Sequence, residues 1–296
     1  MPMKIIKKKE LKMKLSKIIL LSLCLVALMA CEKQPAEKET TVPEGRRAVA
    51  PISNLVESAD AQEVKDALKG SLNASDVDLF FDLVRDYNAS VGKEHLPAAF
   101  GNNRAPVYDV GKIIDARDKS KAKAPDTNCR INTFLLLKDG LVVPDGLGID
   151  DSILFMDKEA LAARPLCNEE ETDAFLRLFS RVKTDDSKDA SHQGRVMEKA
   201  LSKVAFPEKA SMVSVVLHDN LDGNYLFIGH VGVLVKAGEG YVFVEKISFE
   251  EPYQAVKFST KEACYAYLKE RFKDYRDSNV APPFLMDNGR YVGSVR

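Results

Sequence analysis

The cysteine at position 129 is the residue whose type and setting point most directly to chemistry. It lies in PDTNCRINTFLLLKDG, residues 125–140, at the predicted start of a helix. Pro125 disfavours helix before it, and each polar residue of the following DTN sequence can cap the helix. A thiol in the first turn faces unpaired backbone N–H groups and the positive end of the helix macrodipole, and Arg130 adds a cation. This setting favours a thiolate, although it also suits a packed, unreactive core cysteine.

A second candidate, His230, lies within the apolar run YLFIGHVGVLV, which predicts a strand. Folding a hairpin about the sequence AGEG pairs Lys236 with Tyr241 and places Glu245 diagonal to His230 on the same face of the sheet. Glu245 can then hold the second nitrogen of the imidazole. The alternative is a surface glutamate paired with Lys246 or another basic residue. A shift of register by one residue would remove the predicted contact.

Together these side chains supply what the hydrolysis of an amide by a thiol requires. Cys129 is the candidate nucleophile, His230 the candidate acid and base, and Glu245 the group that aligns the ring. The nearest predicted donors to the oxyanion are the backbone N–H of Cys129 and the side chain of Asn128. Asn132 lies on the same side of the helix and is a further candidate.

The order of these residues resembles that of papain-like hydrolases of the NlpC type. In that group a cysteine opens a buried helix, a histidine lies on a strand and a polar residue follows on the next strand. The resemblance covers residues 128–138 and 225–249. It implies a papain-like α+β fold and a cysteine hydrolase that acts on an amide or peptide bond. The sequence departs from the usual pattern in having Asn-Cys-Arg where Asp-Cys-Ser is usual, and in a long helical insert before the strands.

A longer resemblance covers nearly the whole mature chain. The segments TNCRINTFLLLKDG, LFIGHVGVLV and FVEKISFEEPYQAVKF are similar to those of a bacterial lipoprotein family catalogued as domain of unknown function 4300. This resemblance implies a single domain and a lipid anchor, and it implies nothing about a substrate.

The distribution of elements predicts an α+β fold, with a helical N-terminal half packed on an antiparallel sheet. Helical periods recur in AQEVKDALKG, DVDLFFDLVRDYN, VYDVGKIIDARDKS, EETDAFLRLFSRV and GRVMEKALSKV. Ser75 or Asp76 is predicted to cap the second of these helices. The later part of the chain turns to strands, then to a helix opened by a capping box of Ser259 and Glu262, and finally to a hairpin at MDNGRYVG. We assign residues 51–296 to one domain.

The first 30 residues are typical of a signal peptide. Seven lysines precede or adjoin an apolar run, IILLSLCLVALMA, which is shorter than the roughly 20 residues of a membrane-spanning helix. The sequence LMAC, ending at Cys31, resembles a bacterial lipobox, which implies cleavage before Cys31 and a diacylglyceryl thioether on its sulfur. The alternative is an uncleaved N-terminal anchor. Either Met1 or Met13 can be the start of the chain.

Residues 31–50 are charged, contain proline and carry few large apolar groups, which is typical of a flexible tether. We therefore expect a lipoprotein on the exported side of a bacterial membrane, in the cell envelope. Without its first 30 residues the chain has 36 basic and 43 acidic residues, a net charge of −7, which argues against nucleic acid as a partner. The sequence has no HExxH, CxxC, GxSxG or P-loop motif, so no cofactor and no dedicated metal site are predicted.

Three functions fit these observations. The leading hypothesis is a membrane-tethered cysteine hydrolase that acts on an amide, with a peptide or cell-wall peptide as substrate. The second is a lipid-anchored binding module that keeps the fold without the chemistry. The third is a periplasmic metal site formed by Cys129 and His230. The mature chain also contains Cys167 and Cys264 besides Cys129 and the lipidated Cys31, so at least one thiol lacks an internal partner.

Overall fold

The structure is a computed structural model that describes residues 50–102, 105–120 and 126–296. The described residues belong to one compact unit. The predicted signal peptide (1–30), the lipidated Cys31 and the tether (31–50) lie outside the described residues, except for Ala50.

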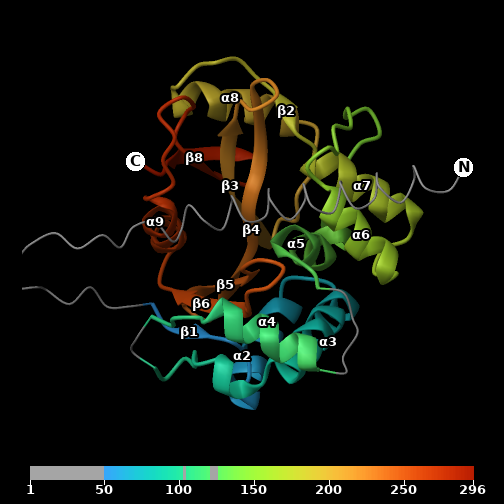
Figure 1. The fold of residues 1–296 in the computed structure, drawn as a ribbon, viewed down its shortest axis with the longest axis vertical. Helices are drawn as coiled ribbons and strands as arrows, with labels where there is room; N and C mark the ends of the chain where they lie inside the picture. Colours follow the sequence, from blue (N-terminus) through green and yellow to red (C-terminus); the bar gives the residue numbers. More distant parts are fainter. Residues whose placement is uncertain (1–49, 103–104, 121–125) are drawn as a thin grey trace, which may run out of the picture. The chain divides into compact units, whose positions relative to one another are not determined.

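An antiparallel sheet of eight strands organises the described residues (Figure 1). Seven strands follow the order β1-β6-β5-β4-β3-β7-β8, and β2 pairs with the beginning of β4. The strands are β1 Ile52–Ser53, β2 Val182–Lys183, β3 Ala210–Asp219, β4 Tyr225–Ala237, β5 Gly240–Lys246, β6 Tyr253–Phe258, β7 Phe284–Asp287 and β8 Arg290–Ser294.

Helices cover both faces of this sheet. On one face, Cys264 and Leu268 of α9 pack with Phe243 of β5. On the other face, apolar residues of α2 to α8 pack with residues such as Val244. Figure 1 shows α9 on one side of β3 and β4, and α5, α6 and α7 on the other. The helices are α2 Ser58–Lys69, α3 Ala74–Val91, α4 Val110–Lys119, α5 Cys129–Leu137, α6 Phe155–Ala163, α7 Glu169–Phe179, α8 Ala190–Leu201 and α9 Lys261–Phe272, with short 3₁₀ helices η1 Lys93–His95 and η2 Lys138–Gly140.

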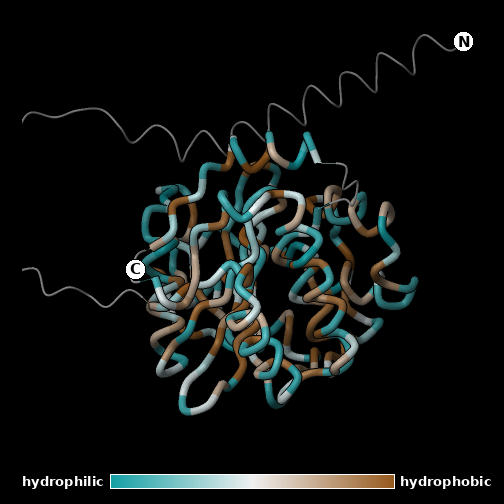
Figure 2. Tube along the Cα trace, turned by 90° about the horizontal axis from the view of Figure 1, so that it is seen from below, coloured by the Kyte–Doolittle hydropathy of each residue, from teal (hydrophilic) through white to brown (hydrophobic). Residues whose placement is uncertain are grey.

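This arrangement confirms the predicted α+β class, with helices from the N-terminal half packed on an antiparallel sheet. Hydrophobic residues gather inside the fold and hydrophilic residues lie toward its outside (Figure 2). In the part of the chain that the structure describes, no helix combines the length and the apolar character needed to cross a membrane.

Two helix caps differ from the prediction by one to three residues. Helix α3 is capped by Asn73, whose side chain accepts a hydrogen bond from the backbone N–H of Ser75, so neither Ser75 nor Asp76 is the cap. Helix α9 is capped by Thr260, and the predicted box of Ser259 with Glu262 is therefore out of step with the helix. Neighbouring residues of similar capping ability make this choice ambiguous from residue type alone.

Strand β4 pairs with β3 along most of its length but with β5 only near its end. Its second half pairs with β5 from Val233↔Val244 to Ala237↔Gly240, in the register predicted from the AGEG turn. At His230, β4 is still paired with Val215 of β3 on its other edge, but it is no longer paired with β5. The ladder between β4 and β5 thus opens before it reaches His230, and α5 packs against both strands in this region. The opening brings the start of a buried helix next to a histidine on a strand.

Candidate active site

Cys129 is the first residue of α5, and the helix is capped as the sequence suggested. The cap is Asn128, whose Oδ1 accepts a hydrogen bond from the backbone N–H of Ile131 at 3.0 Å. Every residue of α5 except Arg130 is buried, and the helix packs against β4 and α3. The thiol therefore has a fixed place at the positive end of a buried helix. The backbone N–H of Cys129 is one of those that a helix cannot pair internally.

The sulfur of Cys129 lies close to His230. The imidazole, the charge of Arg130 and the backbone N–H of Val231 all act on the thiol and favour its ionised form. Burial by itself would raise the pKa of Cys129, because it penalises the thiolate. The hydrogen bond and charge of His230, with the effects of Arg130 and Val231, outweigh burial and lower the pKa of Cys129. These interactions favour a thiolate–imidazolium pair over a neutral thiol and imidazole.

His230 connects the sulfur to Glu245. Its Nε2 hydrogen-bonds to Oε2 of Glu245, so the diagonal contact expected from the hairpin is present, and Nδ1 is the nitrogen left for the sulfur. The side chain of His230 is 4% exposed and that of Glu245 is completely buried. Burial opposes the imidazolium, but the charge of Glu245 and hydrogen bonds to Cys129 and Glu245 together raise the pKa of His230 to about 9.

Two further side chains hold the Glu245 carboxylate. Gln254 on β6 donates its Nε2–H to Oε1 at 2.6 Å. Arg271 at the end of α9 donates from Nη1 to Oε1 at 2.7 Å and to Oε2 at 2.9 Å. Burial raises the pKa of Glu245, but the charges of Arg271 and His230 and the hydrogen bonds overcome it and lower that pKa to about 2. Glu245 is therefore an ionised group fixed from three sides.

The alternative of a surface glutamate paired with Lys246 does not fit this structure. Glu245 is buried and pairs with His230 and Arg271. Lys246 is also buried. Its ammonium donates to backbone carbonyls of the loop that follows, those of Ser248, Phe249 and Glu251.

The two asparagines expected to donate to the oxyanion have other partners. Asn128 donates from Nδ2 to Oδ1 of Asp157 at 2.7 Å, while its own Oδ1 caps α5. Asn132 donates from Nδ2 to Thr127 Oγ1 and to the Asn128 carbonyl, both at 2.8 Å, and its Oδ1 accepts from Tyr253 Oη. These bonds direct both amides into the protein, so the expectation needs correction. The asparagines fix the start of α5, and the first backbone N–H of that helix is the donor that remains.

Several residues that support this site come from distant segments and were not predicted from the sequence. Besides Gln254 and Arg271, Asp157 of α6 is fully buried and accepts two hydrogen bonds from Arg130, at 3.0 and 2.7 Å. Phe272 packs its ring on that of His230, with centroids 5.6 Å apart and planes at 33°. Two of these residues had a local signal in the sequence: Gln254 is a polar residue inside the strand YQAVKF, and Asp157 is an acid inside the apolar segment LFMDKEALAA. Arg271 and Phe272 end an ordinary charged helix and carry no such signal.

The other two cysteines of the described residues are in different surroundings. All three thiols are free. Burial and the charge of Glu171 raise the pKa of Cys167 to about 11. Cys264 is buried between α9 and the sheet, and burial raises its pKa well above the ordinary value. Cys129 is thus the cysteine of the described residues that the protein adapts toward thiolate.

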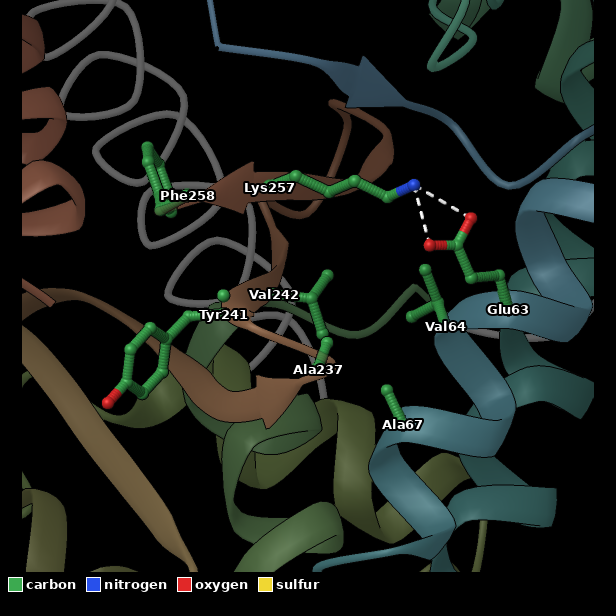
Figure 3. Close-up of a pocket in the computed structure, with 9 residues that line it drawn as sticks. Glu63, Val64, Ala67, Ala237, Tyr241, Val242, Lys257 and Phe258 are labelled. Atoms are coloured by element: carbon green, nitrogen blue, oxygen red, sulfur yellow. Dashed lines mark hydrogen bonds and ion pairs between the residues drawn. The ribbon is translucent and has the colours of Figure 1, made fainter. Parts of the chain in front are cut away.

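In the described part of the chain, Cys129 and His230 do not belong to a group of three side chains that could hold a metal ion. Within residues 50–102, 105–120 and 126–296, no three His, Cys, Asp or Glu side chains are placed to hold a metal ion. A cavity of about 220 Å³ lies elsewhere, between α2 and the β4–β5 hairpin (Figure 3). The ion pair of Glu63 with Lys257 lines it, and none of the site residues does.

The pH dependence of stability provides a first prediction. The pKa of Glu245 is lowered from 4.5, so its contribution to stability is complete above that value and is lost as pH falls toward about 2. The pKa of His230 is raised from 6.5, so its contribution is complete below that value and is lost as pH rises through about 9. We expect the ion pair of His230 and Glu245 to stabilise the fold fully only between pH 4.5 and pH 6.5. Urea unfolding midpoints across pH, compared with those of Glu245→Gln, measure this. Equal pH dependence in the two proteins would contradict the prediction.

The sequence of this chain shows to which protein family it belongs. Searches among curated proteins and among solved structures return no match. The sequence model of a family described as Domain of unknown function (DUF4300) matches residues 51–292, which is most of the chain. On this extent of match, the chain belongs to the DUF4300 family.

Proposed function

We propose that this protein is a papain-like cysteine hydrolase that cleaves an amide or peptide bond and is held at the cell envelope by a lipid on Cys31. The observation that carries the proposal is the contact of Cys129, at the start of a buried helix, with His230, whose other nitrogen is bound by the ionised Glu245. The nucleophile, the general acid and base, and the group that orients it therefore follow one another in space.

The proposed reaction begins from the thiolate–imidazolium pair. The sulfur of Cys129 attacks the carbonyl carbon, and the π electrons of the carbonyl move to its oxygen, which the backbone N–H at the start of α5 faces. The oxyanion then collapses and the C–N bond breaks. The leaving nitrogen takes the proton from Nδ1 of His230 and departs as an amine, which leaves an acyl thioester on Cys129.

The second half of the reaction restores the enzyme. Water attacks the thioester carbon and gives a proton to His230, which now acts as the base. The tetrahedral intermediate expels the Cys129 thiolate and releases a carboxylic acid. Glu245 remains ionised throughout, because its role is to orient the ring and to stabilise the imidazolium. The hydrogen bonds from Gln254 and Arg271 keep the carboxylate in that position.

The predicted lipid tether favours peptides of the cell envelope as the class of substrate. A lipid on Cys31 and the predicted tether of residues 31–50 would keep the domain close to the membrane surface, where cell-wall peptides are present at high effective concentration. The net charge of −7 without the first 30 residues disfavours polyanions as substrates.

The test of this proposal compares the protein with its Cys129→Ala and Cys167→Ala variants on a mixture of cell-wall peptides. We expect wild type and Cys167→Ala to release new amino termini, and mass spectrometry to detect an acyl group on Cys129. Cys129→Ala should release none above background. If Cys129→Ala releases as many amino termini as wild type, the proposal is wrong.

A second candidate, a lipid-anchored binding module, has one observation in its favour. Cys129 is only 6% exposed and His230 only 4%, so both are covered in this state of the protein. A binding module needs neither thiolate nor imidazolium. It predicts that Cys129→Ala keeps full ligand capture and that no acyl adduct forms on Cys129.

A further inference from the structure

The last turn of α9 closes the side of the site opposite to α5. Phe272 covers the imidazole of His230, and Arg271 binds the carboxylate of Glu245. Neither residue is near Cys129 in the sequence, and α9 packs on the opposite face of the sheet from the core that contains α5. The site thus depends on a helix whose sequence shows no sign of it. The following inference about Arg271 rests on the proposed function.

The geometry around Arg271 is that of a strong charge-assisted contact. One guanidinium nitrogen bonds to both oxygens of Glu245, whose side chain has no exposed surface, while the side chain of Arg271 is 25% exposed. Tyr267 of α9 and Glu251 of the β5–β6 loop also face Arg271. Burial lowers the pKa of Arg271, but the charges of Glu245, Tyr267 and Glu251 outweigh it and raise that pKa, so Arg271 remains a cation throughout the working range.

Other groups around Glu245 do not supply a positive charge in place of Arg271. Tyr108, Tyr267 and Cys264 face Glu245 without a positive charge, and their pKa values are raised, mainly by burial. Gln254 is a neutral donor. His230 is the other cation at Glu245, and it is shared with the sulfur of Cys129.

A count of charges shows what Arg271 contributes. Two anions, the Cys129 thiolate and Glu245, are balanced by two cations, His230 and Arg271. The neighbouring Arg130 is matched by the buried Asp157. Without Arg271, the buried group of three would carry a net negative charge, which a protein interior does not tolerate well. The simplest relief is for the sulfur to take up a proton, because Glu245 would still be bound to His230.

We propose that Arg271 is a positioning residue that balances the charge of Glu245 and so allows Cys129 to exist as a thiolate beside the His230 imidazolium. It acts on the nucleophile through Glu245 and His230 and does not touch the sulfur. In this arrangement α9 controls the reactivity of a cysteine that belongs to the other layer of the fold.

The experiment measures how the rate of Cys129 alkylation by iodoacetamide depends on pH in the full chain, with each cysteine quantified by mass spectrometry. Arg271→Gln and Arg271→Met both remove the charge, and Met keeps the aliphatic stem. We expect the midpoint of the rate profile to rise by about one pH unit in either variant. Arg271→Lys keeps the charge but loses the contact with both oxygens, so we expect a smaller rise. Arg276→Gln, which removes an exposed arginine just beyond α9, should leave the profile unchanged.

The outcomes separate this inference from the proposed function. A wild-type profile with the midpoint of an ordinary thiol overturns the proposed function itself. A low midpoint in wild type that stays the same in folded Arg271→Gln or Arg271→Met overturns only the role of Arg271. If neither neutral variant folds, Arg271→Lys decides: because it keeps the charge, its midpoint should stay below that of an ordinary thiol, and a midpoint as high as that of an ordinary thiol rejects charge balance as the role of Arg271. A rise in Arg276→Gln equal to that in the Arg271 variants would also reject it, because it would show a general effect of charge.

Discussion

Replacing His230 with glutamine should slow the alkylation of Cys129 at neutral pH by roughly 10- to 100-fold. In the native protein His230 makes the largest of the contributions that overcome the burial of the sulfur. Glutamine fills similar space but cannot become a cation, so burial would again dominate and the thiol would stay protonated. The rate of iodoacetamide modification of the peptide that contains Cys129 measures the effect.

The matched control for this experiment is His218→Gln. His218 is also buried, at the end of the neighbouring strand β3, but its ring bonds to Asn224 and accepts from the backbone N–H of Ala281. It should leave the rate at Cys129 within about twofold of wild type, as expected for an independent site. If His230→Gln alkylates as fast as His218→Gln, the imidazole does not activate the sulfur.

Replacing Glu245 with glutamine should lower the free energy of unfolding by roughly 3–5 kcal/mol, the usual cost of removing one partner from a buried ion pair. The change leaves His230 and Arg271 without their shared anion and turns one carboxylate oxygen into a donor that faces other donors. Urea denaturation at a pH between 4.5 and 6.5, where the pair is fully ionised, measures the loss.

Glu63→Gln provides the same chemical change at a surface ion pair. Glu63 binds Lys257 at 2.6 Å, yet its side chain is 56% exposed. Because exposed pairs contribute little, the expected loss is below about 1 kcal/mol. A loss for Glu245→Gln no larger than that for Glu63→Gln would show that the buried network does not stabilise the fold as described.

The parts of the site that the sequence predicts are those determined by close neighbours in the chain. Helix α5 starts at Cys129, directly after its cap Asn128 and ahead of an apolar run, as the sequence predicts. The register of β4 and β5 follows from a short turn, and with it the approach of Glu245 to His230. Both inferences need only the local chain and the two-residue period of a strand.

The rest of the site depends on contacts between segments far apart in the sequence. Asp157 reaches Asn128 and Arg130 from α6, and Arg271 reaches Glu245 from α9. The hydropathy pattern of a helix does not show which of its charged residues will point into the protein. For the same reason, the sequence suggested Asn128 as a free donor, whereas the buried Asp157 of α6 takes up its amide. The amide of Asn132 is taken up within its own segment, by Thr127 and the carbonyl of Asn128.

Two polar networks therefore meet at the start of α5. One runs from Asp157 through Asn128 and Arg130 and fixes the helix that carries the thiol. The other runs from Arg271 through Glu245 to His230 and fixes the imidazole and its charge. Each network joins residues of different helices and strands, so the positions of Cys129 and His230 depend on how these elements pack together.

The most direct test of the thiolate is the pH profile of alkylation for the three cysteines of the domain in the wild-type protein. We expect Cys129 to react with a midpoint below that of an ordinary thiol, Cys167 to react appreciably only toward its pKa of about 11, and Cys264 to stay protected. A profile in which Cys129 reacts only at alkaline pH, together with or later than Cys167, would contradict this expectation.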